Sequence, residues 1–223
     1  KFSSKDINGD SIKWEILQLI DGKPDYLNNV ALNPGSISYT LDRNDNTIYA
    51  LQGETKYQEF STESSDGSYF DLADSNIAAD SIQVYIKKTT EKLLEVNSFV
   101  SKDAIDTTLP IPYVVEYNEN KTYRIRFGNK SICKPERLLP AGTTISVFYR
   151  TTNGSKGNIS PGFITANASV IDDNGNTLTV NIYNDLLAAG GTDAETIEDA
   201  KLNGPLSLRT MDRAVTPEDY DII

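Results

Sequence analysis

The chain contains no histidine, and this absence removes several classes of functional site. It excludes Ser-His and Cys-His nucleophile pairs, histidine metal ligands and the commonest general base near neutral pH. The single cysteine, Cys133, excludes a disulfide within the chain. Its neighbours Lys134 and Arg137 could lower the pKa of a thiol, but without a histidine partner we expect a buried or incidental cysteine. These absences argue against an enzyme and fit assembly in a reducing cytoplasm.

Basic stripes and long apolar runs are also missing. No run of about 20 apolar residues occurs, and no basic-then-apolar secretory signal opens the chain. The net charge of −11 would repel nucleic acid, whose binding needs clustered Lys and Arg. We therefore expect neither a nucleic acid nor a membrane as a partner. From Gly190 onward, eight acids stand against three bases. This excess is either a solvated face or a docking surface for a basic partner.

No metal or nucleotide motif is complete. Residues 42–46 (Asp-Arg-Asn-Asp-Asn) resemble the start of a calcium loop, which needs Gly at its sixth position and Glu at its twelfth. Those positions hold Thr47 and Gly53, so a turn is the better interpretation. No glycine-rich stretch ends in the Lys-Ser/Thr of a phosphate-binding loop. We expect the chain to use no cofactor.

Alternating apolar residues are the main signal present, and they predict β-strands. The clearest series are Ile82, Val84 and Ile86; Tyr123, Ile125 and Phe127; and Ile145, Val147 and Tyr149. Ile12, Trp14 and Ile16 predict a further strand near the start. Residues 163–183 predict a hairpin whose arms carry Ala166, Ala168 and Val170 against Leu178, Val180 and Ile182. Asn174-Gly175 between the arms favours a two-residue turn.

Helix signals begin after Gly190. Thr192 and Glu195 have the spacing of a capping box, which predicts a helix from about Asp193 to Leu202, ended by Asn-Gly-Pro at 203–205. Thr-Pro-Glu-Asp at 216–219 predicts a second helix start. The predicted fold is mainly β with a small α-helical C-terminal part (α+β), built of antiparallel sheets and hairpins with helices after Gly190.

The chain begins at Lys1 and stops within an apparent element, so we expect a piece of a longer protein. Its 223 residues are enough for one large domain or two small ones. We predict three parts: an N-terminal connecting segment (1–42), a β-rich domain (43–158), and a β-hairpin followed by helices (159–223).

Two stretches resemble a known family. The first runs through Tyr-Arg-Ile-Arg-Phe-Gly-Asn (123–129), Leu-Pro-Ala-Gly-Thr (139–143), Ile-Ser-Val-Phe-Tyr-Arg (145–150), Thr-Asn-Gly (152–154) and Gly157-Asn158. The second comprises Gly-Gly-Thr-Asp-Ala-Glu-Thr (190–196) and Arg-Ala-Val-Thr-Pro-Glu-Asp-Tyr (213–220). Together they are similar to the baseplate J-like family of wedge proteins from contractile-tail bacteriophages. One departure is Asn129-Lys130, where the family often has Asp-Gly.

The resemblance implies a structural subunit of the tail baseplate. Such subunits form part of the ring around the hub, where they associate with copies of themselves, as a dimer within the ring, and with other baseplate wedge proteins. The ring relays host attachment to sheath contraction, and the subunits bind no cofactor. The expected location is the virion tail baseplate, assembled in the host cytoplasm.

Exposed apolar residues near the C-terminus suggest where such contacts lie. We predict an interface that includes Arg209, Arg213, Val215, Tyr220 and Ile222, because a truncated helix leaves its apolar residues uncovered and arginine suits interface ion pairs. The alternative function is a β-rich carbohydrate-binding module of a phage or bacterial surface protein. Tyr69 with Phe70 and Asp71 could form its site, although Phe70 also fits a core strand.

Overall fold

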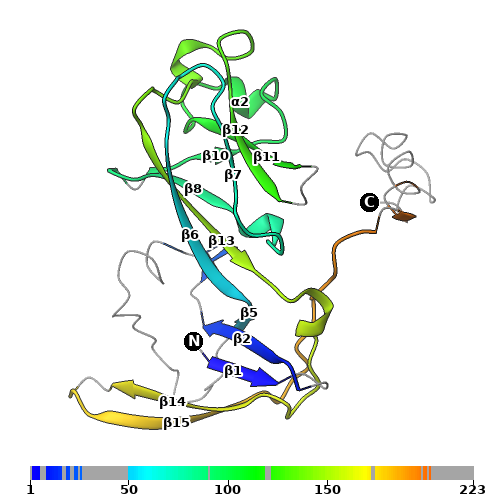
Figure 1. The fold of residues 1–223 in the computed structure, drawn as a ribbon. Helices are drawn as coiled ribbons and strands as arrows, with labels where there is room; N and C mark the ends of the chain where they lie inside the picture. The colour runs from blue at the N-terminus through cyan, green and yellow to red at the C-terminus, as the bar shows by residue number, and fades with distance from the viewer. Residues whose placement is uncertain are drawn as a thin grey trace.

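The computed structural model in Figure 1 describes only part of the chain. The described residues are 2–5, 9–16, 19–20, 23–24, 26, 50–89, 91–118, 122–171, 174–196, 198–199 and 201. The fold is mainly β with a small helical part, as predicted.

Fifteen strands are described. They are β1 (Phe2–Lys5), β2 (Ser11–Ile16), β3 (Leu19–Ile20), β4 (Lys23–Pro24), β5 (Ala50–Gln52), β6 (Glu54–Ser61), β7 (Tyr69–Asp71), β8 (Gln83–Ile86), β9 (Glu91–Lys92), β10 (Leu94–Glu95), β11 (Pro112–Tyr117), β12 (Tyr123–Phe127), β13 (Thr144–Thr151), β14 (Thr165–Ile171) and β15 (Thr177–Tyr183). The strand predicted around Trp14 is β2. Among the described strands, β3 and β4 pair only with each other.

Two four-stranded sheets enclose the main core. One has the order β6-β13-β8-β9 and the other the order β10-β11-β12-β7. Their strands pair antiparallel except for β10 with β11, which is parallel. Apolar side chains from both sheets meet between them: Val84, Tyr113, Ile125, Phe127, Ile145, Val147 and Tyr149, among others. This arrangement is a β-sandwich, in which each inner face removes the apolar surface of the other from water.

Strand β12 follows the predicted alternation, whereas β13 departs from it. Ile125 and Phe127 are buried in the core, and Arg124 lies on the outer face. In β13, residues 145–150 are buried on both faces. The outer side of β13 is covered because Phe148 packs against the rings of Tyr26, Tyr57 and Tyr85.

A second, smaller body lies at the lower end of β6 and β13 (Figure 1). Here β1, β2 and β5 form an antiparallel sheet. Ile12 and Trp14 on β2 pack against Ile159 and Ile164, which follow β13 in the chain. The chain passes from β5 to β6 through Gly53 at φ +118°, and a Cβ there would collide with the Thr151 carbonyl. Only glycine fits this close approach of two backbones.

Strands β14 and β15 form the predicted hairpin. Ala166 pairs with Ile182, and the regular antiparallel register continues to Ile171 opposite Thr177. The predicted two-residue turn is wrong, because residues 172–176 lie between the last paired residues. Gly175 nevertheless has φ +83°, in the left-handed region that favours glycine.

Helical segments before Gly190 were not predicted. They are the short α-helix α2 (Lys102–Ile105), in which the Ser101 hydroxyl accepts from the Ala104 amide at 3.3 Å, and the 3-10 turns η1 (Ala79–Ser81), η2 (Pro135–Arg137) and η3 (Gly154–Gly157). Within the described ranges, no helix has the length and apolar character needed to span a membrane.

The predicted helix start at Asp193 is wrong. Residues 192–196 are not helical, whereas Glu198, Asp199 and Lys201 are. The Thr196 hydroxyl accepts from the Asp199 amide at 3.1 Å and donates to the Asp199 carboxylate at 2.7 Å, so the capping pattern lies four residues later than expected. The helix start predicted at Thr216 lies outside the described residues.

Candidate assembly site

A turn after β13 and the chain after β15 are joined by hydrogen bonds between residues far apart in sequence. We call residues 154–158 and 190–193 the clasp. The Asn158 side chain donates to the Gly191 carbonyl at 2.8 Å and accepts from the Gly191 amide at 2.9 Å. Beside it, the Asp193 carboxylate accepts from the Ser155 amide at 2.9 Å and from the Ser155 hydroxyl at 2.5 Å. These bonds from Ser155 lower the pKa of the Asp193 carboxyl.

The glycines of the clasp permit this close packing. A Cβ on Gly191 would collide with the Gly154 carbonyl, and a Cβ on Gly154 would collide with the Asp193 carboxylate. Gly154 also has φ +57°. The clasp is tied to β5, because the Gln52 side chain donates to the Asn153 side chain at 2.9 Å and accepts from the Asn153 amide at 3.1 Å. The clasp therefore fixes how the chain leaves the hairpin.

A buried ion pair joins the N-terminal sheet to the sandwich. Glu15 on β2 and Arg150 on β13 lie 2.6 Å apart, with 3% and 4% of their side chains exposed. The same Glu15 oxygen accepts from the amide and hydroxyl of Thr55 at 2.9 and 2.7 Å. Arg150 also donates to the carbonyls of Leu51 and Gln52 at 3.2 and 3.1 Å. The pair thus holds β2, β5, β6 and β13 at one point.

The Ser81 and Tyr26 hydroxyls lie near this ion pair. The Arg150 amide donates to the Ser81 hydroxyl at 2.9 Å, and the Tyr26 hydroxyl donates to the Ser81 carbonyl at 2.8 Å. Burial raises the pKa of Tyr26 far above its ordinary value, although the nearby Arg150 charge opposes this shift. Tyr26 is therefore neutral at physiological pH, and its ring covers the outer side of β13.

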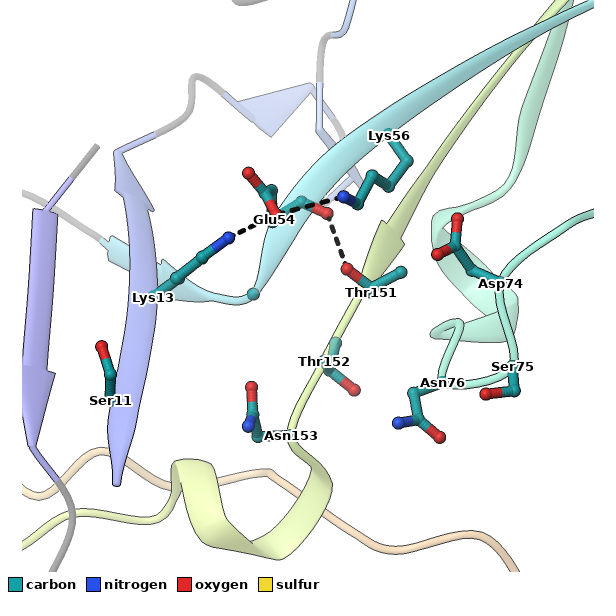
Figure 2. Close-up of a pocket in the computed structure, with 11 residues that line it drawn as sticks. Ser11, Lys13, Glu54, Lys56, Asp74, Ser75, Asn76, Thr151, Thr152 and Asn153 are labelled. Carbon is teal, nitrogen blue, oxygen red and sulfur yellow. Dashed lines mark hydrogen bonds and ion pairs between the residues drawn. The ribbon is translucent and has the colours of Figure 1, made fainter. Parts of the chain in front are cut away.

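A polar cleft of about 350 Å³ opens between the N-terminal sheet and the sandwich (Figure 2). Its lining comes from β2, the β5–β6 turn, the loop after β7 and the end of β13: Ser11, Lys13, Gly53, Glu54, Lys56, Asp74, Ser75, Asn76, Thr151, Thr152 and Asn153. Figure 2 shows that the ammonium groups of Lys13 and Lys56 both point to the Glu54 carboxylate. The hydrogen bond from Lys13 is the main reason why the pKa of Glu54 is lowered.

The side chains that line this cleft suit polar contacts with another molecule. Its two ammonium groups are paired with one carboxylate at 2.8 and 3.2 Å, and its other polar groups are hydroxyls, amides and the Asp74 carboxylate. The Asp74 carboxylate accepts from the Tyr149 hydroxyl at 2.6 Å. Among the described residues, no cluster of three or more Cys, Asp or Glu could hold a metal ion.

The predicted site residues have different outcomes. Arg209, Arg213, Val215, Tyr220 and Ile222 lie outside the described residues, so the C-terminal interface stays a prediction.

Cys133 is half-buried, and burial raises the pKa of its thiol despite Arg137 and Arg126. The neighbouring positive charges therefore do not bring the pKa of the Cys133 thiol below its ordinary value. Tyr69 and Asp71 are exposed on the sandwich, whereas Phe70 stacks on Phe60 beside the core.

Sequence reasoning missed the clasp contacts and the Glu15–Arg150 pair. The sequence contains one indication of this ion pair, because each charged residue comes directly after a large ring-bearing residue of a predicted strand. Glu15 lies between Trp14 and Ile16, and Arg150 follows Tyr149. Such a charge is buried when another element covers the outer face of the strand. No local pattern shows which element does so.

Comparisons with family models, with curated proteins and with solved structures find no match to the chain. The function is therefore argued from the residues and their geometry.

Proposed function

We propose that this chain is a structural subunit of a contractile-tail baseplate wedge. In this role it forms part of the ring around the hub and relays attachment to sheath contraction. It acts through contacts with copies of itself and with other wedge proteins, and it catalyses no reaction. Its place is the tail baseplate of a virion assembled in the host cytoplasm.

The clasp is the observation that carries this proposal. The two stretches that resemble wedge proteins lie more than thirty residues apart, yet Asn158 of one binds Gly191 of the other through two hydrogen bonds. Ser155 and Asp193 repeat this connection. These four residues fix the path of the backbone. In a structural protein, this is the role expected of the residues that carry the family resemblance. The order and spacing of the two stretches thus have a physical reason.

The proposal is tested on assembled particles. Gold-labelled antibodies raised against this chain should mark the baseplate end of contractile tails in electron micrographs. Labelling of heads or of free protein alone would overturn the proposal. Arg213→Glu should reduce incorporation into wedges while the melting temperature of the chain stays within a few degrees, because the predicted contact lies between subunits. A matched Lys201→Glu change, outside the predicted interface region, should leave incorporation unchanged.

One observation favours the alternative, a carbohydrate-binding module. Tyr69 is 58% exposed, and the Arg124 guanidinium lies 4.3 Å from the centre of its ring. Asp71 and Asn118 lie beside them, joined at 3.4 Å. An exposed ring next to polar side chains is the usual form of a sugar platform. A glycan array separates the two proposals: binding that Tyr69→Ala abolishes would favour the module, and the wedge function predicts no bound glycan.

A further inference from the structure

The β14–β15 hairpin differs in charge from the rest of the chain. Charged residues make up 24% of the sequence, but between residues 163 and 184 the only ones are Asp172 and Asp173, between the two strands. The hairpin residues are instead Thr, Asn, Ser, Ala and larger apolar side chains. Edge strands of soluble proteins usually carry charges, prolines or bulges that prevent pairing with another chain. Strand β15 has no charge and no proline, and its pairing with β14 is regular over seven residue pairs.

Strand β15 forms the edge of the hairpin that lies away from β1. Figure 1 shows β14 between β1 and β15, and residues of β14 lie close to β1. Among the described strands, only β14 pairs with β15. Five residues of this strand are exposed, including Leu178 at 49% and Tyr183 at 67%. The backbone of β15 thus offers one row of hydrogen-bonding groups to a further strand.

The sequence of β15 is complementary to itself. If two copies of Thr-Leu-Thr-Val-Asn-Ile-Tyr run antiparallel around Val180, Leu178 faces Ile182 of the other copy and Thr179 faces Asn181. Residues of like polarity then lie opposite each other on each face, as cross-strand pairing favours. In this register, the apolar residues of the two copies lie on one face of the joined sheet and the polar residues lie on the other face.

Charge favours a second copy of this chain as the occupant of the edge. Each copy carries a net charge of −11, so contact through a charged surface would place acids against acids. The uncharged hairpin avoids this repulsion at short range, and more distant charges are screened within about 8 Å at physiological salt. We propose that β15 pairs antiparallel with β15 of a second copy and joins the two hairpins into one four-stranded sheet. Because this twofold contact uses the β15 edge of both copies, it closes at two copies.

This inference deepens the proposed function, because it names the surface through which copies of the subunit meet. The test is sedimentation velocity of the 223-residue chain over a concentration series. We expect a monomer–dimer equilibrium. In Thr179→Lys/Asn181→Lys, two pairs of like charges face each other across the twofold axis, and Kd should rise about tenfold.

The matched variant has charges at the same positions but in complementary order. In Thr179→Lys/Asn181→Glu, each new ammonium group faces a carboxylate of the other copy, so Kd should stay equal or fall. Asn167→Lys/Ser169→Lys, with like charges on the inner strand, should change Kd less than about threefold. Circular dichroism checks that each variant folds.

Two results would overturn the inference. One is a chain that stays monomeric at the highest soluble concentration. The other is a dimer whose Kd is the same in the Lys/Lys and Lys/Glu variants, which would place the contact on another surface and leave the wedge function intact. Failure of the wedge function is seen separately, in the gold labelling of tails.

Discussion

The buried pair between Glu15 and Arg150 makes a sharp prediction for Glu15→Gln. The substitution keeps the size of the side chain and an acceptor for Thr55, but it leaves the Arg150 charge buried without a counter-charge. Removing one partner of a buried pair costs about 3–5 kcal/mol of the free energy of unfolding. Domains are stable by only about 5–15 kcal/mol. We therefore expect a large shift of the unfolding midpoint.

A surface ion pair with the same geometry provides the control. Lys87 and Glu59 are also 2.6 Å apart, but their side chains are 50% and 32% exposed. Glu59→Gln should cost at most about 1 kcal/mol, since water solvates the remaining ammonium group. Because the two ion pairs have the same distance, a difference in the loss of stability between the two variants reflects the difference in burial. Glu15→Gln/Arg150→Met should recover part of the loss, because it removes the unpaired charge.

The assay is urea unfolding followed by two signals. The single tryptophan, Trp14, is buried next to Glu15 and reports the N-terminal sheet, whereas far-ultraviolet circular dichroism reports all strands. In Glu15→Gln, the fluorescence transition should occur at lower urea than the dichroism transition, because the pair joins that sheet to the sandwich. Equal losses within about 1 kcal/mol in Glu15→Gln and Glu59→Gln would refute the reasoning.

Three further predictions concern the clasp, the hairpin loop and alkaline pH. Asn158→Ala should lose about 1–2 kcal/mol in urea unfolding because two hydrogen bonds to Gly191 are removed, and Asn158→Asp should lose at least as much, because a carboxylate oxygen then faces the Gly191 carbonyl in place of the donor. Gly175→Val should cost about 1–2 kcal/mol from backbone strain at φ +83°, whereas Gly175→Asn, which tolerates this region, should melt close to the parent; equal melting temperatures would contradict the strain argument. Burial raises the pKa of Tyr113, so its contribution to stability is complete below the unfolded pKa of about 10 and is lost as pH rises above it. Tyr113→Phe should therefore lose less stability than the parent between about pH 9 and 11.5, and parallel pH curves would exclude this effect.

Strands were predictable where the signal is local. The alternation around Ile125 and Ile145 depends only on neighbouring residues, and it identifies β12 and β13 correctly. What covers a strand depends on distant residues. Phe148 is buried by Tyr26, more than one hundred residues earlier, and no pattern near Phe148 indicates this. The alternation of apolar residues therefore could not predict that β13 is buried on both faces.

The helix after Gly190 shows how a tertiary contact decides between two local patterns. Thr192 and Thr196 each have an acidic residue three positions later, so both are acceptable caps. The bonds from Ser155 to Asp193 engage the first turn of the first candidate outside a helix, and the helix begins at Thr196 instead. Sequence reasoning found the element but not its start.

The long pairing of β6 with β13 has a mechanical consequence. Eight residue pairs, from Thr144 opposite Ser61 to Thr151 opposite Glu54, join the end of the molecule that carries the N-terminal sheet to the sandwich. Hydrogen bonds between antiparallel strands are perpendicular to the strand direction. A pull along the strands therefore shears all of these bonds together, whereas a pull across them opens one bond after another. The molecule should be stiff along this axis and weak across it, so a subunit that transmits tension would be oriented with these two strands along the line of force.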